Sequence, residues 1–324
     1  MPDGPASGDA ARVVPMRSAR RSRRIGALLS PTEVARRLFA LERQVEEALG
    51  AGPGQGSSLV ETAADDLLSA YSQVSRWIGG EEAPGTGIGS AALRALYRYW
   101  WRVDAVGLER VPRRGPVMVV ANRASSLPPY DAFMIALALQ GANPERPVHP
   151  LVDDWLLRLP LARQMLETLG ALPATAGRAR RVLDAGGAAI VFPEGKDALA
   201  KPSARHYRVS RFGRKKLLRV AVETGTPLVP IAVIGSEEVH PVLCRLDAIG
   251  RPLGLPALPL TAGFIPLPTK WTLYVGEPLE VGERLRPEDA DDRDRMKLLR
   301  DQVRERLQAL VSEGVRRRRG LFFG

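Results

Sequence analysis

The sequence predicts an α/β fold, with a mixed but mostly parallel central sheet flanked by helices. The first observation is that short apolar segments alternate with helical segments from about residue 103 onward, which is the pattern of strand–helix units around one sheet. The second is that an apolar segment such as 188–192 suits a strand buried on both faces. The third is that polar residues follow directly after these strands, where α/β proteins place their sites.

The expected elements follow one another along residues 91–286, which we interpret as one α/β domain. Strands are expected at residues 117–121, 148–152, 171–173, 188–192, 228–234 and 272–275. Helices are expected at residues 131–140, 175–186 and 212–223. A final amphipathic helix is expected at 287–312, within a carboxyl-terminal segment, 287–324, that ends in a basic tail.

The amino-terminal part of the chain predicts two further pieces. Residues 1–29 are rich in glycine, proline and arginine, so we expect a disordered basic terminus. Residues 30–90 contain capping boxes at Ser30 and Ser58, each followed by apolar residues at helical spacing. This pattern predicts a helical hairpin and a linker. The hairpin could pack against the main domain or carry a function of its own, and we favour packing.

Residues 91–102 combine aromatic and basic side chains in one predicted helix. Leu93, Leu96, Tyr97 and Trp100 share a face, with arginines close by. Aromatic rings interleaved with arginines suit a helix in a lipid headgroup region. The same pattern suits a helix packed on the protein core, so the sequence leaves both interpretations open.

Positive charge is concentrated at the two ends of the chain. The formal net charge is +11, and residues 1–24 and 316–319 hold most of the excess arginines. Such ends suit a polyanion, either anionic lipid or nucleic acid, or are simply solvated tails. Because no nucleic-acid recognition motif accompanies the arginines, we expect membrane lipids as partners and no nucleic acid.

Other features limit the class of protein. No run of about 18 or more apolar residues is present, so any membrane contact is expected to be peripheral. Residues 1–24 lack the apolar region of a secretory signal. The single cysteine, Cys244, excludes an internal disulfide framework and a cysteine-rich metal site, and it fits a reducing compartment. We therefore expect a cytoplasmic protein with no metal site.

Three segments place candidate site residues after predicted strands. In residues 117–139 the strand ends at Asn122 and Arg123, and Asp131 opens the next helix, where it also suits an ordinary helix cap. In residues 223–238 a turn and a strand lead to an acidic exit. In residues 186–198 the strand ends in a run whose carboxylate and ammonium suit hydrogen bonding to a hydroxyl or phosphate. That run is Phe192, Pro193, Glu194, Gly195 and Lys196.

Together with residues 170–186, 207–225 and 266–278, these segments resemble the phospholipid/glycerol acyltransferase (PlsC-like, lysophospholipid acyltransferase) superfamily. The resemblance covers about residues 95–285 with the blocks in order. It implies the glycerolipid acyltransferase fold, and transfer of a fatty acyl group from acyl-CoA or acyl-carrier protein to a lysophospholipid or glycerolipid hydroxyl. It implies no bound cofactor, a location on the inner face of the membrane, and substrate binding by Asn122 and residues 192–196.

Position 123 departs from the family pattern. The family has a histidine there, the general base that takes the proton of the acceptor hydroxyl, and a downstream aspartate, here Asp131, that orients it. A guanidinium keeps its proton near neutral pH and has no acceptor lone pair, so Arg123 cannot serve as that base. An Arg123–Asp131 ion pair would instead close the site or make it bind anions.

The substitution leaves two alternatives. One is an acyltransferase with a substitute base, for which His149, in the strand expected at residues 148–152, is the candidate. The other is a catalytically silent relative that binds lipid.

Overall fold

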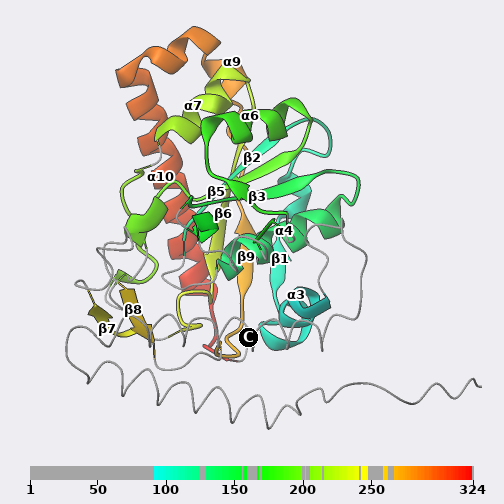
Figure 1. Ribbon diagram of the computed structural model, residues 1–324, viewed down its shortest axis with the longest axis vertical. Coiled ribbons are helices and arrows are strands. Elements are labelled where there is room, and N and C mark those ends of the chain that lie inside the picture. The colour runs from blue at the N-terminus through cyan, green and yellow to red at the C-terminus, as the bar shows by residue number, and fades with distance from the viewer. Residues whose placement is uncertain are drawn as a thin grey trace, which may run out of the picture.

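The computed structural model describes residues 91–123, 129–154, 156–158, 166–167, 170–198, 201, 205–213, 215–240, 242–246, 258–261 and 266–322. Within these ranges, helices cover both faces of a central sheet (Figure 1). The predicted basic terminus, 1–29, and the predicted hairpin and linker, 30–90, lie outside the described residues. The loop 124–128, between Arg123 and the helix of Asp131, also lies outside them.

The central sheet has seven strands. They are β1 (Asp104–Val106), β2 (Val117–Ala121), β3 (Val148–Val152), β4 (Leu172–Pro173), β5 (Ala188–Val191), β6 (Leu228–Ile234) and β9 (Thr272–Val275). Their order is β1-β9-β6-β2-β5-β3-β4. The five strands from β6 to β4 run parallel, whereas β9 pairs antiparallel with β6 and parallel with β1. The sheet is therefore mixed and mostly parallel, which confirms the predicted fold class.

Two helical layers enclose the sheet. The α-helices are α3 (Ala91–Ala95), α4 (Tyr130–Ala142), α6 (Ala176–Asp184), α7 (Lys215–Glu223), α9 (Val281–Arg284) and α10 (Arg293–Arg317). Residues of α3 and α4 pack on one face of the sheet, and residues of α6, α7 and α10 pack on the other. Helix α10 runs along the length of the sheet (Figure 1).

Shorter elements complete the described chain. They are the π-helix η1 (Leu96–Trp100), the 3₁₀ helices η2 (Leu108–Arg110), η3 (Leu156–Arg158), η4 (Gly195–Ala198) and η7 (Pro287–Asp291), and the antiparallel pair β7 (Val242–Leu246) and β8 (Leu258–Thr261).

Strand β2 shows why the core forms as it does. All five of its residues are fully buried. Val117, Val119 and Ala121 face the cluster that includes α4, while Met118 and Val120 face the cluster that includes α10. A strand buried on both faces needs an uninterrupted apolar run, and this is the pattern that the sequence provides.

The direction of the strands determines which segments meet. The carboxyl ends of β6, β2, β5, β3 and β4 lie at one edge of the sheet, which we call the carboxyl edge. Because β1 and β9 run the opposite way, their amino ends lie at the same edge. The segments just before Asp104 and Thr272 are therefore neighbours of the residues that follow β2 and β6.

Several element boundaries differ from the sequence prediction. The predicted helix at 91–102 is a short α-helix followed by the π-helix η1. The predicted helix at 287–312 begins as a 3₁₀ helix, restarts at Arg293 because the Asp292 side chain caps the new amino end, and extends to Arg317. Strand β1 was not predicted, because a three-residue strand has almost no periodicity of its own and is defined by its pairing with β9.

Candidate functional site

Asn122 joins the ends of two strands. Its Nδ2 donates to the carbonyl of Val233 at 3.0 Å, and the Val233 N–H donates to its Oδ1 at 2.7 Å. Through these two bonds the Asn122 side chain extends the hydrogen bonding between β2 and β6 beyond the last main-chain pair. The residue is buried. Substrate binding by Asn122 stays a prediction, while in this structure its amide fixes the chain that leads into position 123.

Arg123 is a buried cation. Only 1% of it is exposed. Its Nη1 lies 3.7 Å from Asp153 Oδ2, and its guanidinium carbon lies 5.6 Å from the ring centre of Phe192. Burial lowers the pKa of the guanidinium, and the charges of Asp131 and Glu194 oppose this effect. A guanidinium in water loses its proton only far above neutral pH, and the neighbouring carboxylates of Asp131 and Glu194 favour its charged form.

Two nitrogens of this guanidinium, Nε and Nη2, have no hydrogen-bond partner within the described part of the chain. Buried donors are nearly always satisfied, so two open donors on one buried cation call for a functional explanation. A planar guanidinium with free N–H groups is well suited to an oxygen anion, such as a phosphate or a developing oxyanion.

Glu194 and Lys201 hold the main chain of Arg123 from both sides. The Arg123 N–H donates to Glu194 Oε1 at 3.0 Å, and Lys201 Nζ donates to the Arg123 carbonyl at 3.3 Å. Lys201 Nζ lies 3.1 Å from Glu194 Oε2, which also accepts the Ser210 N–H at 2.7 Å. Both carboxylate oxygens of Glu194 are thus engaged within the protein. Its predicted contact with substrate stays a prediction, and the structure gives it a positioning role.

A second carboxylate extends this network toward α10. Glu237 Oε1 lies 3.6 Å from Lys201 Nζ, and Glu237 Oε2 accepts the Tyr207 N–H at 3.0 Å. Burial raises the pKa of Glu237 to about 7, against the lowering effect of Lys201. The Tyr207 hydroxyl donates to Glu238 at 2.6 Å, and Arg318 pairs with the same Glu238 carboxylate at 2.6 Å. A continuous polar chain therefore runs from Arg123 to the end of α10.

Asp131 lies at the start of α4 and is buried. Its Oδ1 accepts the N–H of Ala132 at 2.9 Å. Its charge acts on the pKa of Arg123, so the two residues are within electrostatic reach. The preceding residue, Tyr130, contacts Trp101 with ring centres 4.9 Å apart and His240 with ring centres 6.1 Å apart. Asp131 and Arg123 are therefore brought to one region, as the family pattern requires.

The remaining predicted residues form the turn after β5. Phe192 and Pro193 are buried, and Gly195 has a φ of 64°, in the left-handed region that favours glycine. The Gly195 N–H donates to the Phe192 carbonyl at 3.1 Å and closes the turn. Lys196 follows in this turn, but its side chain lies outside the described residues. The turn places Glu194 directly opposite the end of β2.

The substitute base proposed from the sequence is contradicted by the strand register. His149 pairs with Ala189, which lies level with Met118 on β2. Asn122 is four residues further along, roughly 13 Å at the rise of a strand. His149 Nδ1 instead lies 3.0 Å from the Gly170 carbonyl. The sequence located the strand correctly but could not give the register that moves this side chain away from the carboxyl edge.

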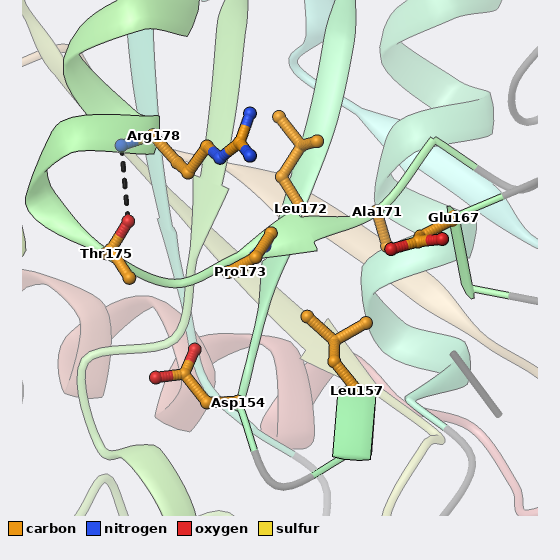
Figure 2. A pocket seen from close by; sticks show the side chains of 8 residues that line it. All are labelled: Asp154, Leu157, Glu167, Ala171, Leu172, Pro173, Thr175 and Arg178. Atoms are coloured by element: carbon orange, nitrogen blue, oxygen red, sulfur yellow. Dashed lines mark hydrogen bonds between the residues drawn. The ribbon is translucent and has the colours of Figure 1, made fainter. Parts of the chain in front are cut away.

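An open cavity of about 530 Å³ lies at the ends of β3 and β4. Figure 2 shows apolar side chains of Leu157, Leu172 and Pro173 in its lining, with the carboxylates of Asp154 and Glu167 at opposite sides of Leu157. Ala171, Thr175 and Arg178 complete the lining. Asp154 follows Asp153, the partner of Arg123, in the chain, but neither Asp153 nor Arg123 lines the cavity.

Sequence reasoning missed three charged residues of this site. Asp153 follows β3 and carried the same signal as Asn122, a polar residue at a strand end. Glu237 lies in the acidic segment after β6, and the sequence pattern assigned this segment no function. Lys201 had no sequence signal, because only the folded chain places it between Glu194 and Glu237.

A family model described as Acyltransferase matches residues 102–234. This span includes Asn122, Arg123, Asp131 and the turn around Glu194. The chain belongs to the acyltransferase family. The match confirms the family that the sequence motifs predicted, and the seven-stranded sheet agrees with the α/β fold expected of it.

Relatives of this acyltransferase-family chain occur in mycobacteria. It is 32% identical over 312 residues to the uncharacterized protein Rv0502 of Mycobacterium tuberculosis, covering 90% of this chain and 86% of that protein. It is 36% identical over 241 residues to the uncharacterized protein ML2427 of Mycobacterium leprae, an alignment that spans 72% of this chain and 65% of that protein. Among solved structures it is similar to the 1-acyl-sn-glycerophosphate acyltransferase PlsC of Thermotoga maritima, with 19% identity, a TM-score of 0.44, and coverage of 86% of this chain and 90% of that one.

Two features are absent from the ranges that the structure describes. No grouping of His, Cys, Asp and Glu side chains within those ranges is arranged to hold a metal ion. In the same part of the chain, no helix combines the length and the apolar character needed to cross a bilayer.

Proposed function

We propose that this chain transfers a fatty acyl group from acyl-CoA or acyl-carrier protein to the hydroxyl of a lysophospholipid or another glycerolipid. Membership of the acyltransferase family supports the reaction class. The observation that carries the proposal is the meeting of the family's motif residues at one edge of the sheet, where the Glu194 carboxylate accepts the main-chain N–H of Arg123. The work of such an enzyme belongs to phospholipid biosynthesis, on the cytoplasmic face of a membrane.

In this proposal Arg123 acts as a fixed cation. The acceptor hydroxyl oxygen attacks the thioester carbonyl, the new C–O bond forms, the C–S bond breaks, and the hydroxyl proton leaves with the thiol. Negative charge develops on the carbonyl oxygen, and pre-positioned donors stabilise it. Among the described residues no acceptor binds Arg123 Nε or Nη2, and these two donors suit either this oxygen or a phosphate of the acceptor.

The cavity beside Asp154 is the proposed place for the acceptor. Its volume of about 530 Å³ lies within the range of small-ligand sites. Leu157, Leu172 and Pro173 would contact the apolar part of a lipid, while Thr175 and Arg178 would contact its polar part. A lining with one apolar part and one polar part suits a lipid with a single polar end, such as a lysophospholipid.

A second candidate function rests on the same arginine. General-base assistance contributes roughly 10²–10⁴-fold to a rate, and Arg123 cannot provide it. A catalytically silent relative that binds lipid at this site is therefore the alternative.

The two functions are separated by measuring turnover and binding together. The purified protein would receive palmitoyl-CoA and a panel of lysophospholipids, with free CoA followed by a thiol reagent and lysolipid binding followed by calorimetry. Acyl transfer predicts CoA release that requires a lysolipid. The silent alternative predicts binding with release at the protein-free rate. Absence of both binding and release across the panel would overturn both proposals.

A further inference from the structure

Two segments far apart in the sequence lie side by side at the carboxyl edge. Arg102 Nη1 donates to the Trp100 carbonyl at 2.7 Å, and Arg102 Nη2 donates to the Phe322 carbonyl at 2.6 Å. The Lys270 N–H donates to the Leu321 carbonyl at 2.9 Å. Figure 1 shows α3 and the carboxyl terminus at the same end of the molecule. The segment before β1 and the segment after α10 therefore form one surface.

Several hydrogen bonds hold the junction between these segments in one conformation. Arg102 has a φ of 46°, in the left-handed region that residues other than glycine seldom adopt. Such a conformation persists where surrounding contacts fix it. Here one guanidinium binds three main-chain carbonyls, those of Trp100, Phe322 and, at 3.1 Å, Pro268. Lys270 Nζ also donates to the Arg102 carbonyl.

Arg318 fixes the turn that follows α10. Its Nη1 lies 2.6 Å from Glu238 Oε1 and 3.1 Å from the Tyr207 hydroxyl, and its Nε donates to the Gly320 carbonyl at 3.0 Å. The tail is thus attached to the polar network that reaches Arg123. The position of Leu321 and Phe322 follows from these bonds.

The outward side of this surface is aromatic and cationic. Tyr99 is 72% exposed, Trp100 38%, Leu321 49% and Phe322 40%. Arg98, Arg316 and Arg319, in the same two segments of the chain, are also exposed. Within the described ranges these three arginines pair with no carboxylate, and Arg98 instead lies 5.9 Å from the ring centre of Tyr99. We call these seven residues the aromatic–arginine surface.

The aromatic–arginine surface adjoins the candidate site. Trp101, next to Trp100, packs against Tyr130, and Tyr130 precedes Asp131. At the other end of the surface, α10 packs on the end of β6, since Gly314 lies against Ile234. A partner that covered this surface would therefore lie at the edge of the sheet where the motif residues meet.

We propose that the aromatic–arginine surface docks onto the surface of an anionic lipid bilayer. Exposed aromatic rings and leucine suit the headgroup boundary, where one part of the side chain is apolar and another is wet. Arginines that pair with no carboxylate of the described residues complement a negatively charged leaflet. This inference deepens the proposed function, because it brings the site edge to the membrane that would supply a lipid acceptor.

The first test removes charge. The purified chain would be sedimented with vesicles of phosphatidylcholine containing phosphatidylglycerol. The double variant Arg316→Gln/Arg319→Gln should lower the partition coefficient about tenfold or more, because each cation near an anionic leaflet contributes to binding. The matched control is Arg293→Gln/Lys297→Gln, which removes the same charge from exposed positions at the other end of α10, roughly 35 Å away at the rise of an α-helix. Equal losses in the two variants would overturn the proposal.

The second test removes apolar contact. Tyr99→Ser/Phe322→Ser should lower the partition coefficient about tenfold, whereas Leu298→Ser, which removes a side chain that is 70% exposed on the far part of α10, should leave it unchanged. Brominated lipid should quench the native fluorescence, and Trp100→Phe should remove most of this quenching. Quenching that survives Trp100→Phe would place another face on the bilayer and overturn the assignment.

Other occupants of this surface give different outcomes. Tighter binding to duplex DNA than to anionic vesicles at matched salt would assign it to nucleic acid. A dimer in the absence of lipid, lost in Tyr99→Ser/Phe322→Ser, would assign it to a second copy. Either result overturns bilayer docking. Vesicle binding without any CoA release would contradict the proposed acyl transfer and leave bilayer docking supported. CoA release from soluble short-chain substrates without vesicle binding would contradict bilayer docking and leave acyl transfer supported.

Discussion

The main-chain N–H of Arg123 donates a 3.0 Å hydrogen bond to the buried carboxylate of Glu194. This bond connects the end of β2 with the turn after β5, and it involves no side-chain atom of Arg123. This bond, which fixes the main chain at position 123, is therefore independent of the side chain found there. A histidine introduced at this position should occupy the same place, near Asp131.

The first prediction uses this independence. We expect Arg123→His to raise CoA release with a lysolipid acceptor by about 100-fold or more, because an imidazole can accept the hydroxyl proton and a guanidinium cannot. Arg123→Gln, which removes the cation without adding a base, should not raise it. The measurement is kcat from initial rates at saturating palmitoyl-CoA. Equal rates in the two variants would show that the family's proton acceptor does not operate from position 123.

The second prediction concerns the ion pair beneath Arg123. Replacing Lys201 by Met leaves Glu194 and Glu237 buried without their shared cation. Breaking a buried pair in this way lowers the free energy of unfolding by about 3–5 kcal/mol. Urea unfolding would measure the loss, and Lys297→Met, an exposed lysine on α10, should change the value by less than about 0.5 kcal/mol. A small loss in Lys201→Met would mean that the network contributes little to stability.

The third prediction is a pH dependence of stability. Burial raises the pKa of Glu237 to about 7 from an ordinary value of 4.5. Between these values the folded protein holds a proton that the unfolded chain has released, so the free energy of unfolding falls as the pH rises from 4.5 to 7. The contribution is roughly 3 kcal/mol and should level off above pH 7.

Glu237→Gln is the control for this effect. The amide has no carboxyl proton to lose, so the variant should lose less stability than the native chain between pH 5 and pH 7. Parallel pH profiles of the two proteins in urea unfolding would assign the native slope to other groups.

The fourth prediction tests how α10 packs on the sheet. A Cβ added at Gly314 would lie 2.7 Å from Ile234 Cγ1 and 2.9 Å from the Tyr274 ring, closer than side chains pack. Gly314→Ala should therefore lower the free energy of unfolding by about 1–3 kcal/mol, despite the better helix propensity of alanine. Gly177, in α6, has open space around the same position, and Gly177→Ala should be neutral or stabilising by about 0.5 kcal/mol. Equal stabilities in thermal unfolding would contradict this packing.

The strands that carry the motif could be predicted from the sequence because their signal is local. An apolar run such as residues 117–121 suits only an element buried on both faces, and the structure places β2 there. Asn122 and Glu194 could be identified as candidates because each follows such a run. Strand β1 could not be, because its three residues become a strand only through pairing with β9.

The sequence by itself determined the α/β class, the family, and the absence of a proton acceptor at position 123, since each depends on residue identity or local pattern. Only the tertiary structure decided that Glu194 binds main chain, that Lys201 lies between two carboxylates, and that His149 lies level with Met118. It also decided that Trp100 and Phe322 share one surface. The physical reason is that strand register and long-range contacts depend on how the whole sheet packs, which no local stretch of residues encodes.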